Sequence, residues 1–168
     1  RQILNQLYQP GDVSFEAKYS DSYIIPTTAW DLDELASNLR DQDTEEILGL
    51  GVKPRQAIDY SFANSKRQHV MRTNDEKLVC CFGVGDGPNN TGVIWCLGTP
   101  LVKKVHHTFL KHSREWLDFL LDGYFYVYNL ISESNTVSMR WLQWLGAEFT
   151  EDNAPQGYRY FTIRRRTA

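Results

Sequence analysis

Residues 124–149, YFYVYNLISESNTVSMRWLQWLGAEF, decide the fold of this chain. Residues 124–131 are apolar on both faces, as expected for a strand in the middle of a sheet. A short polar turn follows, and Asn135 is a residue type that caps the first turn of a helix. Leu145-Gly146 ends that helix, because glycine is favoured where a helix stops. The segment therefore predicts a strand, a turn and a helix in succession.

The pattern of the whole chain predicts a mixed α/β sheet with helices on both faces. Helices are expected after a capping box at Thr28, from Glu45-Glu46 after a break at residues 41–44, from Pro54, and over residues 101–121. Strands are expected at residues 22–27, 70–73, 77–84, 92–97 and 157–164. Residues 1–20 carry a Pro10-Gly11-Asp12 turn signal and predict an N-terminal arm, with residues 21–168 as a single domain.

Composition restricts the classes of function. The chain has 168 residues, 42% hydrophobic residues and a net charge of -3, which gives no general attraction to nucleic acid or anionic lipid. Arg164, Arg165 and Arg166 form a basic triplet, either a solvated tail or a patch for nucleic acid or an acidic partner. No apolar run approaches the ~20 residues that span a bilayer, and the first residues lack the pattern of a signal peptide.

Neither the cysteines nor the histidines predict a metal site. Cys80, Cys81 and Cys96 lie in apolar strand-like runs without a Cys-x-x-Cys spacing, which indicates buried thiols. Four histidines lack ligand spacing: His69, His106, His107 and His112. Trp141 and Trp144 are three residues apart and share a helix face, so we expect core packing, a plugged cleft or a partner surface.

The order of elements over about residues 22–164 resembles GNAT, the superfamily of acetyl-CoA-dependent N-acyltransferases, which has a mostly antiparallel central sheet. In that family the fourth strand leads into a loop of the shape Gln/Arg-x-x-Gly-x-Gly/Ala, whose backbone N–H groups bind the cofactor pyrophosphate. The matching residues 99–106, TPLVKKVH, contain no glycine after Gly98. Lys103 and Lys104 could supply positive charge instead, or they are the solvated first turns of a helix.

The second half of the resemblance concerns the helix that follows Asn135. Asn135 and Ser138 stand at family positions, whereas the family tyrosine that protonates the leaving thiolate corresponds to Leu142. A leucine cannot act as a general acid. Glu133 is the nearby candidate for a general base, with a loop carboxylate before the helix as the alternative. If acetyl-CoA binds, the expected cofactor-binding residues are Cys96, Leu97, Lys103, Lys104, Asn135 and Ser138.

Residues 109–163 also resemble the small GNAT-like proteins encoded beside the internal virion proteins of short-tailed phages. The shared features include Phe109 and Arg114 on one helix, Arg140-Trp141-Leu142 after Asn135, and Tyr160-Phe161-Thr162-Ile163 near the end. The resemblance implies a structural or virion-assembly protein with a degenerate acetyl-CoA site. Its partners would be other phage virion or assembly proteins, in the virion or the host cytoplasm. An active N-acetyltransferase and a host-directed effector are the alternatives.

Overall fold

The computed structural model describes residues 8–165, which form one mixed sheet in the order β1-β2-β3-β4-β5-β6-β8-β7. All neighbouring strands are antiparallel except β5 and β6, which are parallel. The strands are β1 (Ala17–Lys18), β2 (Ser22–Pro26), β3 (Arg67–Thr73), β4 (Leu78–Asp86), β5 (Gly92–Gly98), β6 (Tyr126–Ser132), β7 (Glu148–Thr150) and β8 (Tyr158–Arg164).

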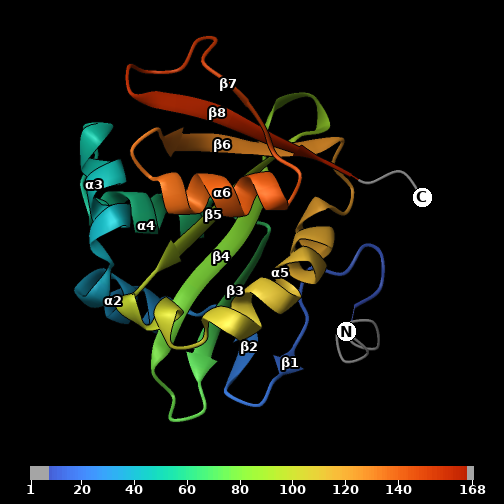
Figure 1. Ribbon diagram of the computed structural model, residues 1–168. Coiled ribbons are helices and arrows are strands. Elements are labelled where there is room, and N and C mark those ends of the chain that lie inside the picture. Colours follow the sequence, from blue (N-terminus) through green and yellow to red (C-terminus); the bar gives the residue numbers. More distant parts are fainter. Residues whose placement is uncertain (1–7, 166–168) are drawn as a thin grey trace.

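The helices cover both faces of the sheet, as the sequence predicts, and Figure 1 shows α5 and α6 in front of it. They are α2 (Ala29–Asn38), α3 (Asp41–Gly49), α4 (Pro54–Ala63), α5 (His106–Leu121) and α6 (Thr136–Trp144). Alternate strand residues point to opposite faces. Met71 and Cys80 accordingly pack with α5 and α6, whereas Val70 and Cys81 pack with α2 and α4.

Two helix starts differ from the sequence prediction. α3 begins at Asp41 rather than at Glu45, because Asp41 and Asp43 already place acidic side chains in its first turn. α5 begins at His106 rather than near residue 101. A short 3₁₀ turn, η2 (Pro100–Lys103), comes first, and the Thr99 side chain accepts a hydrogen bond from the Leu101 N–H. The short strands β1 and β7 were not predicted either.

The predicted strand, turn and helix of residues 124–149 are present. The strand is β6, and Asn135 caps α6 by accepting a hydrogen bond from the Ser138 N–H through its side chain. Gly146 follows the helix with φ +97°, in the left-handed region that glycine adopts without strain. The local chemistry of this segment therefore agrees with the fold around it.

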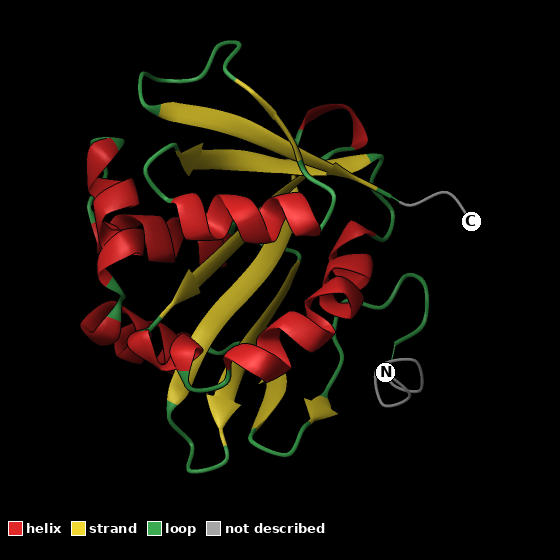
Figure 2. Cartoon of the chain, in the orientation of Figure 1, coloured by secondary structure: helices red, strands yellow, loops and turns green. Residues whose placement is uncertain are grey.

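β5 and β6 separate soon after they meet, which Figure 2 shows as two diverging strands. Their ladder consists of two pairs, Gly92 with Val127 and Val93 with Tyr128. β5 is consequently half-buried from Val93 to Leu97, although it lies in the middle of the sheet. The sheet is thus open on one side of β5 at its carboxyl end.

Residues 8–20, the described part of the expected N-terminal arm, pack against the sheet. Phe15 is buried and stacks on His69 with 4.5 Å between ring centroids. Ala17 and Lys18 pair with β2. Residues 1–7 of the expected arm, and Arg166 of the basic triplet, lie outside the described residues. Within residues 8–165, no helix is long and apolar enough to cross a bilayer, and no cluster of three potential metal ligands occurs.

Candidate functional site

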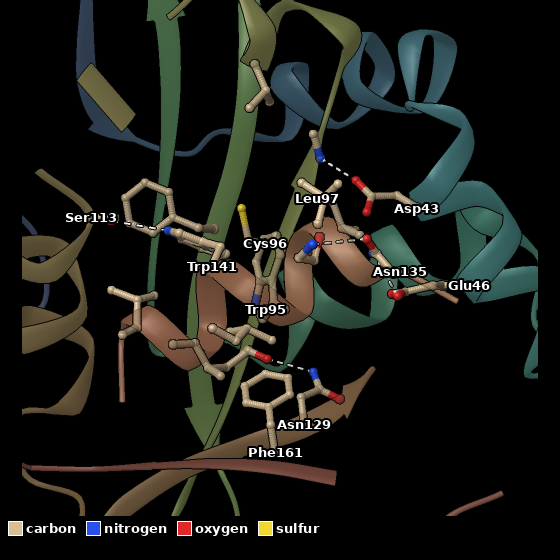
Figure 3. A pocket seen from close by; sticks show the side chains of 18 of the residues that line it. Asp43, Glu46, Trp95, Cys96, Leu97, Ser113, Asn129, Asn135, Trp141 and Phe161 are labelled. Atoms are coloured by element: carbon tan, nitrogen blue, oxygen red, sulfur yellow. Dashed lines mark hydrogen bonds between the residues drawn. The ribbon is translucent and has the colours of Figure 1, made fainter. Parts of the chain in front are cut away.

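A cavity of about 360 Å³ lies where β5 and β6 separate. Residues from α3 and α4 line it on one side and residues from α5 and α6 on the other. Figure 3 shows Cys96, Trp141 and Phe161 around it, with Asp43 and Glu46 approaching from α3. Ligand pockets are usually about 300–1,000 Å³, so the cavity can hold a small ligand or a short segment of chain.

The opening exposes one edge of β5. In an antiparallel ladder, alternate residues point their N–H and C=O groups away from the partner strand. The Gly98 N–H donates to Asp43 Oδ2 at 2.8 Å, and the Ile94 carbonyl accepts from Asn129 Nδ2 at 2.6 Å. Ile94, Cys96 and Gly98 therefore face away from β4 and into the opening. Side chains of other elements satisfy this edge at both ends.

The facing edge of β6 is satisfied in the same way. The Leu130 N–H donates to Asn129 Oδ1 at 2.7 Å, and the Ser132 N–H donates to Glu46 Oε1 at 3.1 Å. The amide group of Asn129 and the carboxyl groups of Asp43 and Glu46 thus form hydrogen bonds that a continuous ladder between β5 and β6 would supply. The chain keeps the two strands apart without leaving these backbone groups unpaired.

The groups at the mouth of the cavity carry an excess of negative charge. Asp43 is 6% exposed and pairs with Arg40, whose Nε donates to Asp43 Oδ2 at 3.0 Å. Burial raises the pKa of the Asp43 carboxyl, although Arg40 and the Gly98 N–H act in the opposite direction. Burial also raises the pKa of Glu46, against the effect of Asn135 and Ser132. The Arg40 guanidinium group pairs with Asp43, whereas Glu46 accepts hydrogen bonds from the Ser132 N–H and the Asn135 amide.

Asn135 and Ser138 both line the cavity, together with Cys96 and Leu97. The Asn135 amide is already engaged, since Nδ2 donates to Glu46 Oε1 at 3.0 Å while Oδ1 caps α6. Ser138 Oγ accepts from Arg40 Nη2 at 3.3 Å. These contacts join α3 to the start of α6. The structure therefore brings four of the six expected cofactor-binding residues to one cavity.

The two lysines of that expected set lie elsewhere. Lys103 and Lys104 are exposed and do not line the cavity. Their loop forms a turn on itself, in which the Val102 N–H donates to the Thr99 carbonyl and the Lys104 N–H to the Leu101 carbonyl. A side chain at Gly98 would collide with Val102. The Val102 and Lys104 N–H groups are therefore used within the turn and are not free to bind a pyrophosphate.

Leu142 is buried at 7% exposure in the apolar cluster, so no hydroxyl group takes the place of the family tyrosine. Glu133 accepts from Arg159 Nε at 3.1 Å and lies outside the cavity lining. Trp141 lines the cavity and packs on Phe109 at 5.1 Å.

Trp144 differs from Trp141 although the two are three residues apart. It is 46% exposed, and the Arg114 guanidinium lies 4.0 Å from its ring centroid. The expectation of core packing is therefore wrong for Trp144. A cation over an exposed indole ring is an arrangement that also occurs at protein interfaces.

Sequence reasoning missed the polar residues that shape the mouth of the cavity. Arg40, Asp43 and Glu46 belong to the region around α3 and reach β5 and β6 through tertiary packing. Asp43 and Glu46 are three residues apart, the spacing that places two side chains on one helix face. Asn129 is the polar residue of an otherwise apolar run, and that contrast was the available signal for it.

The fold is that of the GNAT acetyltransferases, and three solved structures illustrate the likeness. An acetyltransferase (GNAT family) from Bacillus anthracis has 13% identity and a TM-score of 0.61, covering 89% of this chain and 98% of its own. The Escherichia coli ribosomal-protein-S18-alanine N-acetyltransferase has 10% identity and a TM-score of 0.61, and the match covers 88% of this chain and 96% of that one. An acetyltransferase from Agrobacterium tumefaciens str. C58 has 12% identity and a TM-score of 0.61, and the match covers 95% of this chain and 98% of that one. At these identities the matches show the fold alone.

The sequence shows which family the chain belongs to. Residues 70–154, half of the chain, match the profile of the family described as "Bacteriophage T7, probable scaffold protein Gp13", and the chain belongs to that family. No curated protein matches the chain. The expectation of a GNAT-like fold in a phage protein is thereby confirmed.

Proposed function

We propose that this protein assists phage assembly through protein–protein contacts, on a GNAT-like fold whose acetyl-CoA site is degenerate. The family description, a probable scaffold protein, supports the assembly role. The observation that carries the loss of cofactor binding is the bond between the Gly98 N–H and the buried Asp43 carboxyl. This carboxyl group already occupies a donor at the end of the strand where the family places its pyrophosphate loop.

Electrostatics support the same proposal. A pyrophosphate is an anion, and like charges at close range in a partly buried site repel strongly. Asp43 and Glu46 outnumber Arg40 at the mouth of the cavity, and Lys103 and Lys104 are exposed and do not line it. Leu142 removes the general acid as well. Both binding and chemistry would therefore be impaired.

Calorimetric titration with acetyl-CoA, and with free CoA for comparison, tests the cofactor part of the proposal. We expect no heat of binding up to about 1 mM ligand. Replacing Asp43 by Asn and Glu46 by Gln in one variant should lower the Kd for CoA at least tenfold, because repulsion is removed. Binding of one acetyl-CoA per wild-type chain at micromolar concentration, followed by acetylation of an amine, would sink the proposal.

Complementation tests the assembly part. A phage lacking this gene is supplied with the wild-type protein, with no protein, or with the Asp33→Asn variant, whose substitution removes an exposed carboxyl group outside the cavity. Particle yield is then measured, and purified particles are probed for the protein to distinguish the virion from the host cytoplasm. We expect the wild-type protein to restore particles containing the internal proteins. Normal particles without it would contradict an assembly role.

An N-acetyltransferase is the second candidate, favoured by the open cavity between β5 and β6. Acyl transfer depends largely on positioning the reactants, and water could carry the proton that Leu142 cannot supply. In this alternative Lys103 and Lys104 bind the pyrophosphate. Replacing both by alanine should then raise the Kd for acetyl-CoA at least tenfold. An unchanged Kd would remove that assignment.

A further inference from the structure

We propose that the cavity between β5 and β6 binds an extended segment of a partner polypeptide, which adds to the edge of β5 and places a lysine or arginine side chain against Asp43 and Glu46. This inference rests on the proposed role in assembly and identifies a contact site for it. The segment would enter where the ladder between β5 and β6 ends, at Val93 and Tyr128.

The backbone of Cys96 offers the first recognition element. Its register partner on β4 is Phe82, and by alternation its N–H and C=O groups face the opening together with those of Ile94 and Gly98. β6 no longer pairs with β5 at Cys96, because their ladder ends at Val93 and Tyr128. Neighbouring side chains satisfy the Ile94 carbonyl and the Gly98 N–H, so Cys96 is the position where a polypeptide can exchange a pair of hydrogen bonds.

The cavity offers an apolar surface of limited size. Phe109, Trp141 and Phe161 contribute aromatic walls, and Leu142 and Leu145 contribute aliphatic ones. A volume of about 360 Å³ accommodates a short segment rather than a full strand. The bound segment should therefore carry small apolar side chains next to the residue that pairs with Cys96.

Charge decides which polypeptide fits. Arg40 is paired with Asp43, whereas Glu46 accepts its bonds from the Ser132 N–H and the Asn135 amide. The described residues provide no ion pair to Glu46, so a cationic side chain would complete the site. A lysine or arginine also has an apolar stem that can follow the cavity wall. An acidic segment would meet like charge and would be excluded.

A labelled peptide tests the inference on the full-length protein. The probe is the blocked peptide Gly-Val-Ala-Lys-Val-Gly with a fluorophore, compared with the same peptide carrying Glu for Lys and with one N-methylated at the central alanine. Fluorescence anisotropy gives the Kd values. The variants are Asp43→Asn with Glu46→Gln, and Asp33→Asn as a control, since Asp33 is an exposed carboxyl on α2 paired with Arg55.

Alkylation of Cys96 locates the bound peptide. Cys80 and Cys81 are fully buried, whereas Cys96 is half-buried and lines the cavity. Iodoacetamide should therefore modify Cys96 first, and mass spectrometry should show that saturating lysine peptide slows this reaction at least fivefold. A Cys96→Ser variant identifies the modified thiol.

We expect the lysine peptide to bind at least tenfold more tightly than the glutamate and N-methylated peptides. The double variant should lose the preference for lysine, and Asp33→Asn should keep it. Equal binding of all three peptides, no protection of Cys96, or no binding at about 1 mM would overturn the inference. The assembly role would survive that result if complementation still restores particles, whereas acetyl-CoA turnover would remove the proposed function itself.

Discussion

Acidification should weaken the contact between residues 8–20 and the sheet, because that contact depends on an uncharged histidine. His69 is 0% exposed, and its Nε2 accepts a hydrogen bond from the Phe15 N–H at 3.1 Å. Burial lowers the pKa of His69 to about 4. A proton on Nε2 would occupy the position that now accepts the Phe15 N–H, and it would place a charge in the apolar core.

The sign and size of the effect follow from the two pKa values of His69. The unfolded chain binds the proton near the ordinary pKa of 6.5, and the folded chain binds it only near 4. Stability is therefore lost as the pH falls from the unfolded to the folded value. The difference of 6.5 minus 4 is 2.5 pKa units, which at about 1.36 kcal/mol each amounts to about 3 kcal/mol. This is a large fraction of the 5–15 kcal/mol typical of a domain.

Urea denaturation between about pH 7 and about pH 4 measures the effect, with His69→Gln as the matched variant. Glutamine keeps an acceptor for the Phe15 N–H but does not titrate. The stability of the wild type minus that of the variant should fall by about 3 kcal/mol over this range. A difference that stays constant would refute the reasoning. Limited proteolysis then shows whether residues 8–20 detach first, as expected if residues 21–168 form the domain that we propose.

Two further predictions concern buried charges. Replacing Arg67, which is 3% exposed and donates to the last carbonyls of α5, by Met should cost about 3 kcal/mol in urea denaturation. The exposed control Arg55→Met should cost under about 1 kcal/mol, and equal losses would contradict the capping role. Burial raises the pKa of Asp43 and Glu46. The stability that these two carboxyl groups contribute is therefore present below their pKa in the unfolded chain, and it is lost as the pH rises through their pKa in the folded chain. The Asp43→Asn, Glu46→Gln variant should therefore lose less stability than the wild type as pH rises to 7, and parallel pH curves would contradict this.

Local signals in the sequence predicted the order of elements and part of the site. The helix cap at Asn135 and the loss of the family tyrosine at Leu142 depend on residue type and spacing alone, and the structure contains both features. The separation of β5 and β6 could not be read in the same way. It depends on the bond from Asn129 to Ile94. It also depends on contacts between α3 and the strands, which join residues 55 positions apart in the bond from Gly98 to Asp43 and 86 positions apart in the bond from Ser132 to Glu46.

The bonds of these side chains also explain how the opening between β5 and β6 is stabilised. Separating two central strands leaves backbone groups unpaired, and each unpaired buried group costs about 1–3 kcal/mol. Asn129, Asp43 and Glu46 supply partners for the Ile94 carbonyl and for the N–H groups of two strands. Burying the ionised Asp43 carboxyl is unfavourable, and its bonds with Arg40 and Gly98 offset only part of that cost, so its pKa remains raised. The opening between β5 and β6 is therefore stabilised by hydrogen bonds within the chain itself.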